Sequence, residues 1–191
     1  MIEHEAHVGS KYKDGIDGQR IAIIGFSHWG EIEEDDNSGT KNCIHNVMSG
    51  KWRIRFFTAI RNYFQFMDHS VFWDRVMFFN FLPDCVGGPD QRFGNGTPGQ
   101  IERGQERFLR LIGAECPHKA LVFTSRKWAF PKAASEDAPL DCPFSSFSKR
   151  MYCGQNFAVP IFFLRHPQGA NGNLMRDVVS HVRAVPIAAR T

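Results

Sequence analysis

The sequence lacks the features that mark membrane proteins, secreted proteins and disulfide scaffolds. No apolar run approaches the ~20 residues that a membrane-spanning helix needs, and the polar N-terminus (MIEHEAHVGSKYKDG) contains no apolar signal segment. The five cysteines are odd in number and widely spaced, and no CxxC pair occurs among them. This pattern indicates neither a disulfide framework nor a zinc or iron–sulfur site. We therefore expect a soluble, cytoplasmic protein with no metal and no other cofactor.

The chain also has little excess charge. Its 191 residues include 23 Lys and Arg against 20 Asp and Glu, which gives a net charge of +3. This charge permits a nucleic-acid partner without requiring one, because dedicated nucleic-acid-binding domains are often far more basic. Hydrophobic residues at 42% and aromatic residues at 13% exclude global disorder and supply enough apolar surface for one domain over residues 1–191.

Four short apolar segments have the length and composition of buried β-strands, and helical patterns separate them. The strands are expected at residues 21–26, 76–81, 120–125 and 160–165. Helices are expected over residues 51–67, from a capping box at residues 97–100 to Gly113, and over residues 174–183. The alternation predicts an α/β fold: a three-layer α/β/α sandwich with a central, mostly parallel four-stranded sheet. The remaining segments are expected to be an N-terminal arm at residues 1–19, a loop at 31–42 and an irregular insertion at 131–150.

Polar or glycine-bearing residues follow each predicted strand. Ligands of α/β folds bind at the carboxyl ends of parallel strands, so the site is expected at GFSHWG, NFLPD, TSRKW and RHPQGANG. GFSHWG fails as a nucleophile elbow, because Trp29 occupies the place where G-x-S-x-G needs glycine, and it lacks the glycine pattern of nucleotide-binding loops. Two alternatives stay open here: a turn with incidental polar residues, and a hydrolase that uses Ser27 and His166 with a third, acidic residue.

Two polar residues at predicted strand ends each have a structural and a functional interpretation. Asn80 stands in an apolar strand, where its amide either bonds neighbouring backbone or reads a planar ligand such as a nucleobase edge. His166 is either a solvated loop residue or a neutral imidazole that donates a hydrogen bond to an oxygen gaining negative charge. Each residue taken alone leaves both interpretations open.

The order of these segments resembles that of the uracil-DNA glycosylase superfamily over about residues 20–185. Members carry a motif such as GQDPY or GINPG after the first strand, an Asn in a strand such as LLLN, and a late loop such as HPSPLS or NPSGLS. The segments that resemble these motifs are Gly25-Phe26-Ser27-His28-Trp29, Phe78-Phe79-Asn80 and His166-Pro167-Gln168-Gly169-Ala170-Asn171. The resemblance implies a monomer that hydrolyses, without a metal, the N-glycosidic bond of a deaminated or damaged base in DNA, with uracil the first candidate.

The resemblance also implies roles for individual residues. Asn80 would bond the edge of the flipped base, His166 would stabilise the leaving base and Ser27 would position water. Trp29 would exclude thymine by its bulk, beside Gly25 and Phe26 in the base pocket. The residues expected to contact DNA are the late loop, Pro167, Gln168, Gly169, Ala170 and Asn171, and the basic pair Arg126 and Lys127.

Two departures from the family pattern affect the expected activity. Ser27 occupies the place of the usual Asp or Asn, and its uncharged hydroxyl is a poor general base, although Glu31, Glu33 and Glu34 offer carboxylates nearby in sequence. Ala170 occupies the place of an intercalating Leu, so single-stranded or disrupted DNA should be the easier substrate. Phe26 and Phe56 are the candidates for stacking on the base. The alternative function is a catalytically weak or inactive relative that binds nucleic acid or nucleotides.

Overall fold

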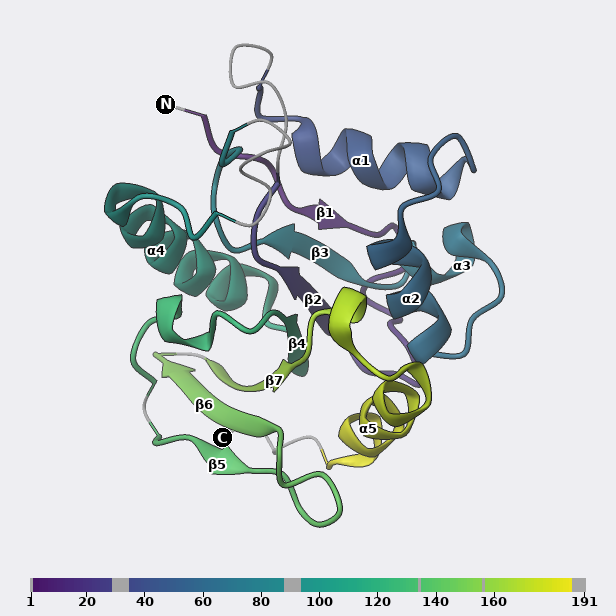
Figure 1. Ribbon diagram of the computed structural model, residues 1–191, viewed down its shortest axis with the longest axis vertical. Helices are drawn as coiled ribbons and strands as arrows, with labels where there is room; N and C mark the ends of the chain where they lie inside the picture. The colour runs from purple at the N-terminus through teal and green to yellow at the C-terminus, as the bar shows by residue number, and fades with distance from the viewer. Residues whose placement is uncertain (1, 29–34, 88–93, 134, 156, 187–191) are drawn as a thin grey trace.

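One mixed β-sheet of seven strands runs through the protein. The computed structural model describes residues 2–28, 35–87, 94–133, 135–155 and 157–186. The strands follow the order β1-β3-β2-β4-β7-β6-β5 across the sheet (Figure 1). Their bounds are β1 His7–Val8, β2 Ile21–Gly25, β3 Met77–Asn80, β4 Lys119–Phe123, β5 Ala138–Pro139, β6 Ser148–Gly154 and β7 Phe157–Leu164.

The centre of the sheet is parallel and consists of the four strands expected from the sequence. β2 lies between β3 and β4, and β7 adds to the far side of β4, all in parallel register. The register places Gly25 of β2 opposite Asn80 of β3. The near-continuous apolar runs of these strands are explained by helices on both faces, which leave few positions for polar residues.

The expected four-stranded sheet is nevertheless too small. Two segments in which no strand is expected from the sequence contribute the additional ones: β1 lies within the expected N-terminal arm, and β5 and the first three residues of β6 lie within the expected insertion at residues 131–150. All three pair antiparallel: β1 forms one edge of the sheet, and β6 and β5 extend the other edge beyond β7. β1 and β5 have only two residues each, and β6 is a half-exposed strand whose seven residues all pair with β7. Such short or polar edge strands are defined by their pairing rather than by an apolar pattern.

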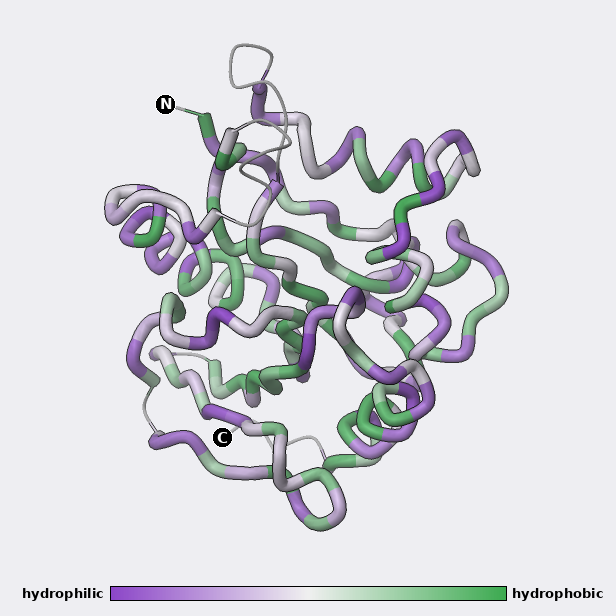
Figure 2. The backbone as a smooth tube through the Cα atoms, in the orientation of Figure 1, coloured by the Kyte–Doolittle hydropathy of each residue, from purple (hydrophilic) through white to green (hydrophobic). Residues whose placement is uncertain are grey.

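Helices cover both faces of the sheet and form the predicted three layers. One face carries α1 Gly39–Met48, α2 Arg55–Tyr63, α3 His69–Trp73 and α5 Gly172–Ala184, and the other carries α4 Pro98–Glu115 (Figure 1). Successive side chains of β2 alternate between these layers: Ile21 and Ile23 face the four-helix side, and Ala22 and Ile24 face α4. The central strands are accordingly the most uniformly hydrophobic part of the backbone in Figure 2.

The observed helix ends show which helix boundaries the local sequence predicts correctly. The capping box at the start of α4 is confirmed, because the Thr97 hydroxyl accepts from the Gln100 backbone N–H at 3.2 Å and the Gln100 amide oxygen accepts from the Thr97 N–H at 2.9 Å. α4 continues two residues beyond Gly113, to Glu115, and α2 is shorter than the expected 51–67 helix. α1 begins inside the expected 31–42 loop, and neither it nor the five-residue α3 is expected from the sequence pattern. No helix in the described part of the chain is both long and apolar enough to cross a membrane.

Candidate active site at the carboxyl ends of the strands

The parallel strands end at one edge of the sheet, where the predicted site residues follow them. Gly25 and Asn80 are the last residues of β2 and β3, Thr124 and Ser125 follow β4, and His166 follows β7 by two residues. Parallel direction therefore gathers side chains that are up to 141 residues apart in the sequence, counted from Gly25 to His166. This is the edge at which α/β folds bind ligands.

Asn80 lies against the backbone of Gly25 and is the most unusual polar residue of the edge. Its exposed fraction is 6%, and the described residues provide no hydrogen-bond partner for its side-chain amide. A Cβ atom built on Gly25 would lie 2.1 Å from the Asn80 Oδ1 atom, so the missing side chain at residue 25 is what gives the amide its place. The amide therefore places two donor hydrogens and one acceptor at the carboxyl edge of the sheet, without a hydrogen bond to another described residue.

A buried arginine from α4 holds the backbone of Asn80. Arg107 is 2% exposed, and its two terminal nitrogens donate to the carbonyl oxygens of Asn80 and His4. Burial lowers the pKa of Arg107 to about 10, which still leaves the guanidinium charged at neutral pH. Arg107 is not among the residues predicted for the site. The helical spacing could have indicated its burial, because Arg107 lies on the same face of α4 as the buried residues Gly104, Phe108 and Ile112.

His166 is held as a neutral imidazole with one defined donor. The backbone N–H of Gln168 donates to Nδ1 at 3.2 Å, so Nδ1 keeps its lone pair and the neutral ring carries its hydrogen on Nε2. Desolvation, and then the positive charge of Arg126, lower the pKa of His166. The residue is exposed at the rim, while its ring packs against Phe56 at 5.3 Å between centroids. The Nε2–H group of the neutral ring is therefore available as a donor on the side away from the Gln168 backbone.

Phe56 lies close both to His166 and to the Gly25–Asn80 pair. Besides its contact with His166, its Cζ atom would lie 3.5 Å from a Cβ on Gly25. The aromatic ring thus lies between His166 on one side and the Gly25–Asn80 pair on the other, and it is only partly buried. Phe26, the other predicted stacking residue, turns to the opposite layer and stacks on Phe81 at 5.8 Å.

A cavity of about 400 Å³ opens beside His166, between the ends of β4 and β7 and the start of β6. Its walls include Thr124, Ser125, Ser148 and Arg165, together with Gly169 of the late loop. Arg165 is exposed, with its guanidinium 5.6 Å from the centre of the Phe147 ring. The cavity thus combines hydroxyl groups with a cation at its rim.

The predicted basic pair at this edge is engaged within the protein. The Arg126 guanidinium lies 4.8 Å from the centre of the Phe26 ring, and its Nε donates to Asn95 Oδ1 at 2.7 Å. Lys127 forms an ion pair with Asp137 at 2.5 Å and donates to the Ser148 hydroxyl at 3.2 Å. The contacts of Lys127 tie the segment after β4 to the start of β6.

The late loop is a 3₁₀ turn, η4 (Pro167–Gly169), that leads into α5. Pro167 is buried, whereas Gln168 and Gly169 are exposed. Ala170 packs against the four-helix layer of the core, and the Asn171 side chain caps α5 by accepting from the backbone N–H groups of Asn173 at 3.0 Å and Leu174 at 3.2 Å. Among these loop residues, Gln168, Gly169 and Asn171 are exposed.

The segment after β2 is only partly described. Ser27 is half-buried, and His28 donates to or accepts from the Thr40 hydroxyl at 3.0 Å through Nε2. Trp29 and the acidic residues Glu31, Glu33 and Glu34 lie outside the described residues, so their expected roles stay predictions. No protein-family model matches the chain, and no curated protein matches it either.

Proposed function

We propose that the protein hydrolyses the N-glycosidic bond of a deaminated or damaged base in DNA, with uracil as the first base to test. The observation that carries the proposal is the side-chain amide of Asn80, a residue that is 6% exposed: it lies against Gly25 at a strand end and makes no hydrogen bond to another described residue. An amide offers one acceptor and two donor hydrogens in one plane, which matches the adjacent N–H and C=O groups of a uracil edge.

His166 supplies the second element that the reaction needs. As the bond between C1′ and the base nitrogen breaks, the electron pair moves to the base and its carbonyl oxygen gains negative charge. The Nε2–H of neutral His166 can donate to that oxygen, and stabilisation of this kind is strongest in a partly dehydrated site. Water then adds its oxygen to C1′, and its remaining proton passes to the base or solvent. Phe56 offers a ring face at the same edge for stacking.

A second function, binding without catalysis, is supported by Ser27. An uncharged hydroxyl follows β2, where a carboxylate would otherwise orient water and stabilise the cationic sugar. A protein with the amide and imidazole in place, and without an acid, would bind a base or nucleotide and turn it over slowly.

The test is excision from an oligonucleotide that carries one uracil, presented single-stranded, opposite G and opposite A. We expect alkali-sensitive cleavage by the wild type and a loss of about 100-fold or more in Asn80→Ala and His166→Ala, because each removes a hydrogen bond to the base. Asn62→Ala, at an exposed helix position, is the matched control. No cleavage of uracil, hypoxanthine or xanthine substrates, with binding retained, would leave the binding function, and Ser27→Asp would then test whether an acid alone is missing.

The pH dependence of excision should follow His166. Its pKa lies below the ordinary value of about 6.5, so the ring is neutral at and above that pH and becomes protonated only as the pH falls further. Protonation places a hydrogen on Nδ1 against the Gln168 N–H, and the ring must leave its position. We therefore expect kcat/KM to fall on the acid side below about pH 6.5. The acid limb should be absent from the residual activity of His166→Gln and present in His69→Gln. An unchanged limb in His166→Gln would show that another group titrates.

A further inference from the structure

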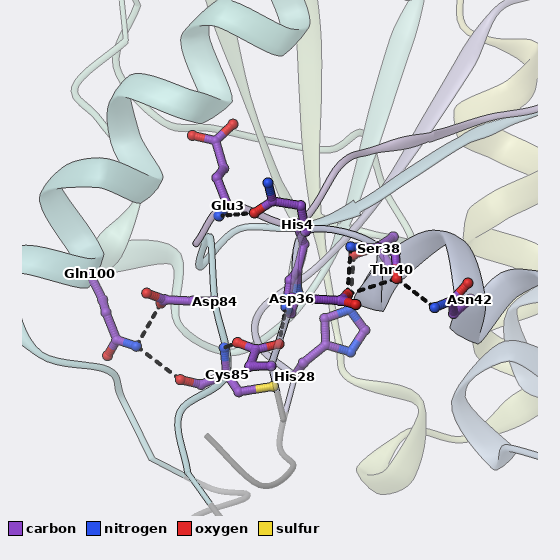
Figure 3. Close-up of polar contacts among 12 residues, drawn as sticks. Glu3, His4, His28, Asp36, Ser38, Thr40, Asn42, Asp84, Cys85 and Gln100 are labelled. Atoms are coloured by element: carbon purple, nitrogen blue, oxygen red, sulfur yellow. Dashed lines mark hydrogen bonds and ion pairs between the residues drawn. The ribbon is translucent and has the colours of Figure 1, made fainter. Parts of the chain in front are cut away.

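A second cluster of chemically reactive side chains lies beside the N-terminal segment, apart from the Asn80–His166 edge. His4, Asp35 and Cys85 come from three separate segments, and one donor atom from each lies within 4.8 Å of the other two. His4 Nε2 is 2.5 Å from Asp35 Oδ1, and the Cys85 backbone N–H donates to Asp35 Oδ2 at 2.9 Å. Figure 3 shows His4 and Cys85 beside the ring of His28.

The backbone holds these three segments together independently of the side chains. The His4 N–H donates to the Pro83 carbonyl at 2.7 Å, which fixes the His4 segment to the one that carries Cys85. The Glu5 N–H donates to the Asn37 carbonyl at 2.7 Å, which fixes the same segment to the one that carries Asp35. The donor atoms are therefore preorganised, which lowers the entropy that a ligand must overcome.

Two of the three side chains are buried, and one polar atom of the cluster is unsatisfied. The exposed fraction of the side chain is 2% for His4 and 6% for Asp35. His4 Nδ1 is buried and has no hydrogen-bond partner among the described residues. The ring of His28 packs edge-on against His4, with 5.0 Å between the ring centroids. Gly39 makes room for the His4 ring, because a Cβ there would lie 3.0 Å from Nε2.

We propose that His4, Asp35 and Cys85 bind one zinc ion that ties the N-terminal segment to the segment before α1 and to the segment after β3. One imidazole nitrogen, one carboxylate oxygen and one thiolate sulfur form a donor set that suits zinc better than the harder cations, which prefer oxygen alone. In a tetrahedral site with bonds of about 2.0–2.3 Å, donor atoms lie about 3.3–3.8 Å apart. Separations of up to 4.8 Å therefore need only side-chain adjustments of about 1 Å.

Binding would replace the hydrogen bond between His4 and Asp35 with two bonds to the metal, and the Cys85 thiol would release its proton to solvent. Water would fill the fourth position. No sequence motif marks this site, because its ligands stand at positions 4, 35 and 85 without the paired spacing of zinc motifs. The proposal does not depend on glycosylase activity.

The test uses the full-length protein, stripped of metal with a chelator and titrated with zinc and with cobalt(II). We expect one zinc ion per chain, a thiolate-to-cobalt charge-transfer band in the near ultraviolet, and a melting temperature that rises by several degrees with zinc. Cys85→Ser should lose the band and at least about 100-fold in zinc affinity. Cys153→Ser, at an exposed position of β6, is the matched control and should keep both.

A second readout needs no variant and covers the case in which Cys85→Ser fails to fold. Zinc should slow alkylation of Cys85 in the wild type by at least about tenfold, measured by peptide mass spectrometry, while Cys153 in the same sample reacts at an unchanged rate. Absence of stoichiometric zinc uptake would overturn the proposal. So would a cobalt band that persists in folded Cys85→Ser, or alkylation of Cys85 that zinc does not slow.

Discussion

Gly25→Ala should abolish most of the excision activity while leaving the protein folded. The added methyl group would lie 2.1 Å from Asn80 Oδ1, and the amide is the flexible partner in that contact. It would rotate away from the strand end and lose its alignment with the base. We expect a loss of about 100-fold, similar to that of Asn80→Ala, because both changes remove the same hydrogen bonds.

The measurement is the single-turnover rate on the uracil oligonucleotide, together with the side-chain amide resonance of Asn80 in a ¹⁵N-labelled sample. Gly99→Ala is the control, because an added Cβ there meets no atom within 4 Å. The double variant Gly25→Ala with Asn80→Ala should be no slower than Asn80→Ala alone, since residues that act as one unit are not additive. Full activity in Gly25→Ala, or an unmoved Asn80 resonance, would contradict the proposed role of the pair.

Arg107→Met should destabilise the fold far more than the removal of an exposed positive charge. Methionine retains much of the aliphatic volume, but the carbonyl oxygens of Asn80 and His4 then lose a charged donor in a buried place. Hydrogen bonds to charged groups are worth about 1.5–3 kcal/mol each, so the free energy of unfolding should fall by about 3 kcal/mol or more.

Chemical denaturation of Arg107→Met and of a matched control measures this effect. The control is Arg110→Met, one turn along the same helix, where the exposed guanidinium pairs with Glu3. That substitution should cost less than about 1 kcal/mol, because exposed ion pairs contribute little. An equal decrease in the free energy of unfolding in the two variants would show that the buried hydrogen bonds of Arg107 stabilise the fold no more than an exposed ion pair does. A binding or activity loss in Arg107→Met under conditions where it is folded would further link α4 to the position of Asn80.

The zinc site and the base site respond to different experiments. Removal of zinc should change the melting temperature and the reactivity of Cys85, whereas Asn80→Ala should change excision and leave both unchanged. The two sites are adjacent in the sequence only after β3, where Cys85 follows Asn80 by five residues. We expect zinc to stabilise the segments that carry its three ligands even if the metal takes no part in chemistry.

The local sequence was enough to predict those elements that are encoded by a few consecutive residues. The four central strands are unbroken apolar runs, and a strand buried on both faces permits little else. The start of α4 is encoded by Thr97, Pro98 and Gln100 together, which is why that boundary could be predicted to the residue. Gly25, Asn80 and His166 could be singled out because each is a polar or glycine residue at the end of such a run.

Only the tertiary structure decided which residues meet. β1, β5 and β6 exist because another strand pairs with them, and the pairing energy is absent from their own composition. The same holds for Arg107, whose partners are 27 and 103 residues away, and for His4, Asp35 and Cys85, which are brought together by backbone hydrogen bonds between separate segments. A sequence states the chemistry of each side chain, while distance and burial, which set its partners and its pKa, arise only when distant segments pack.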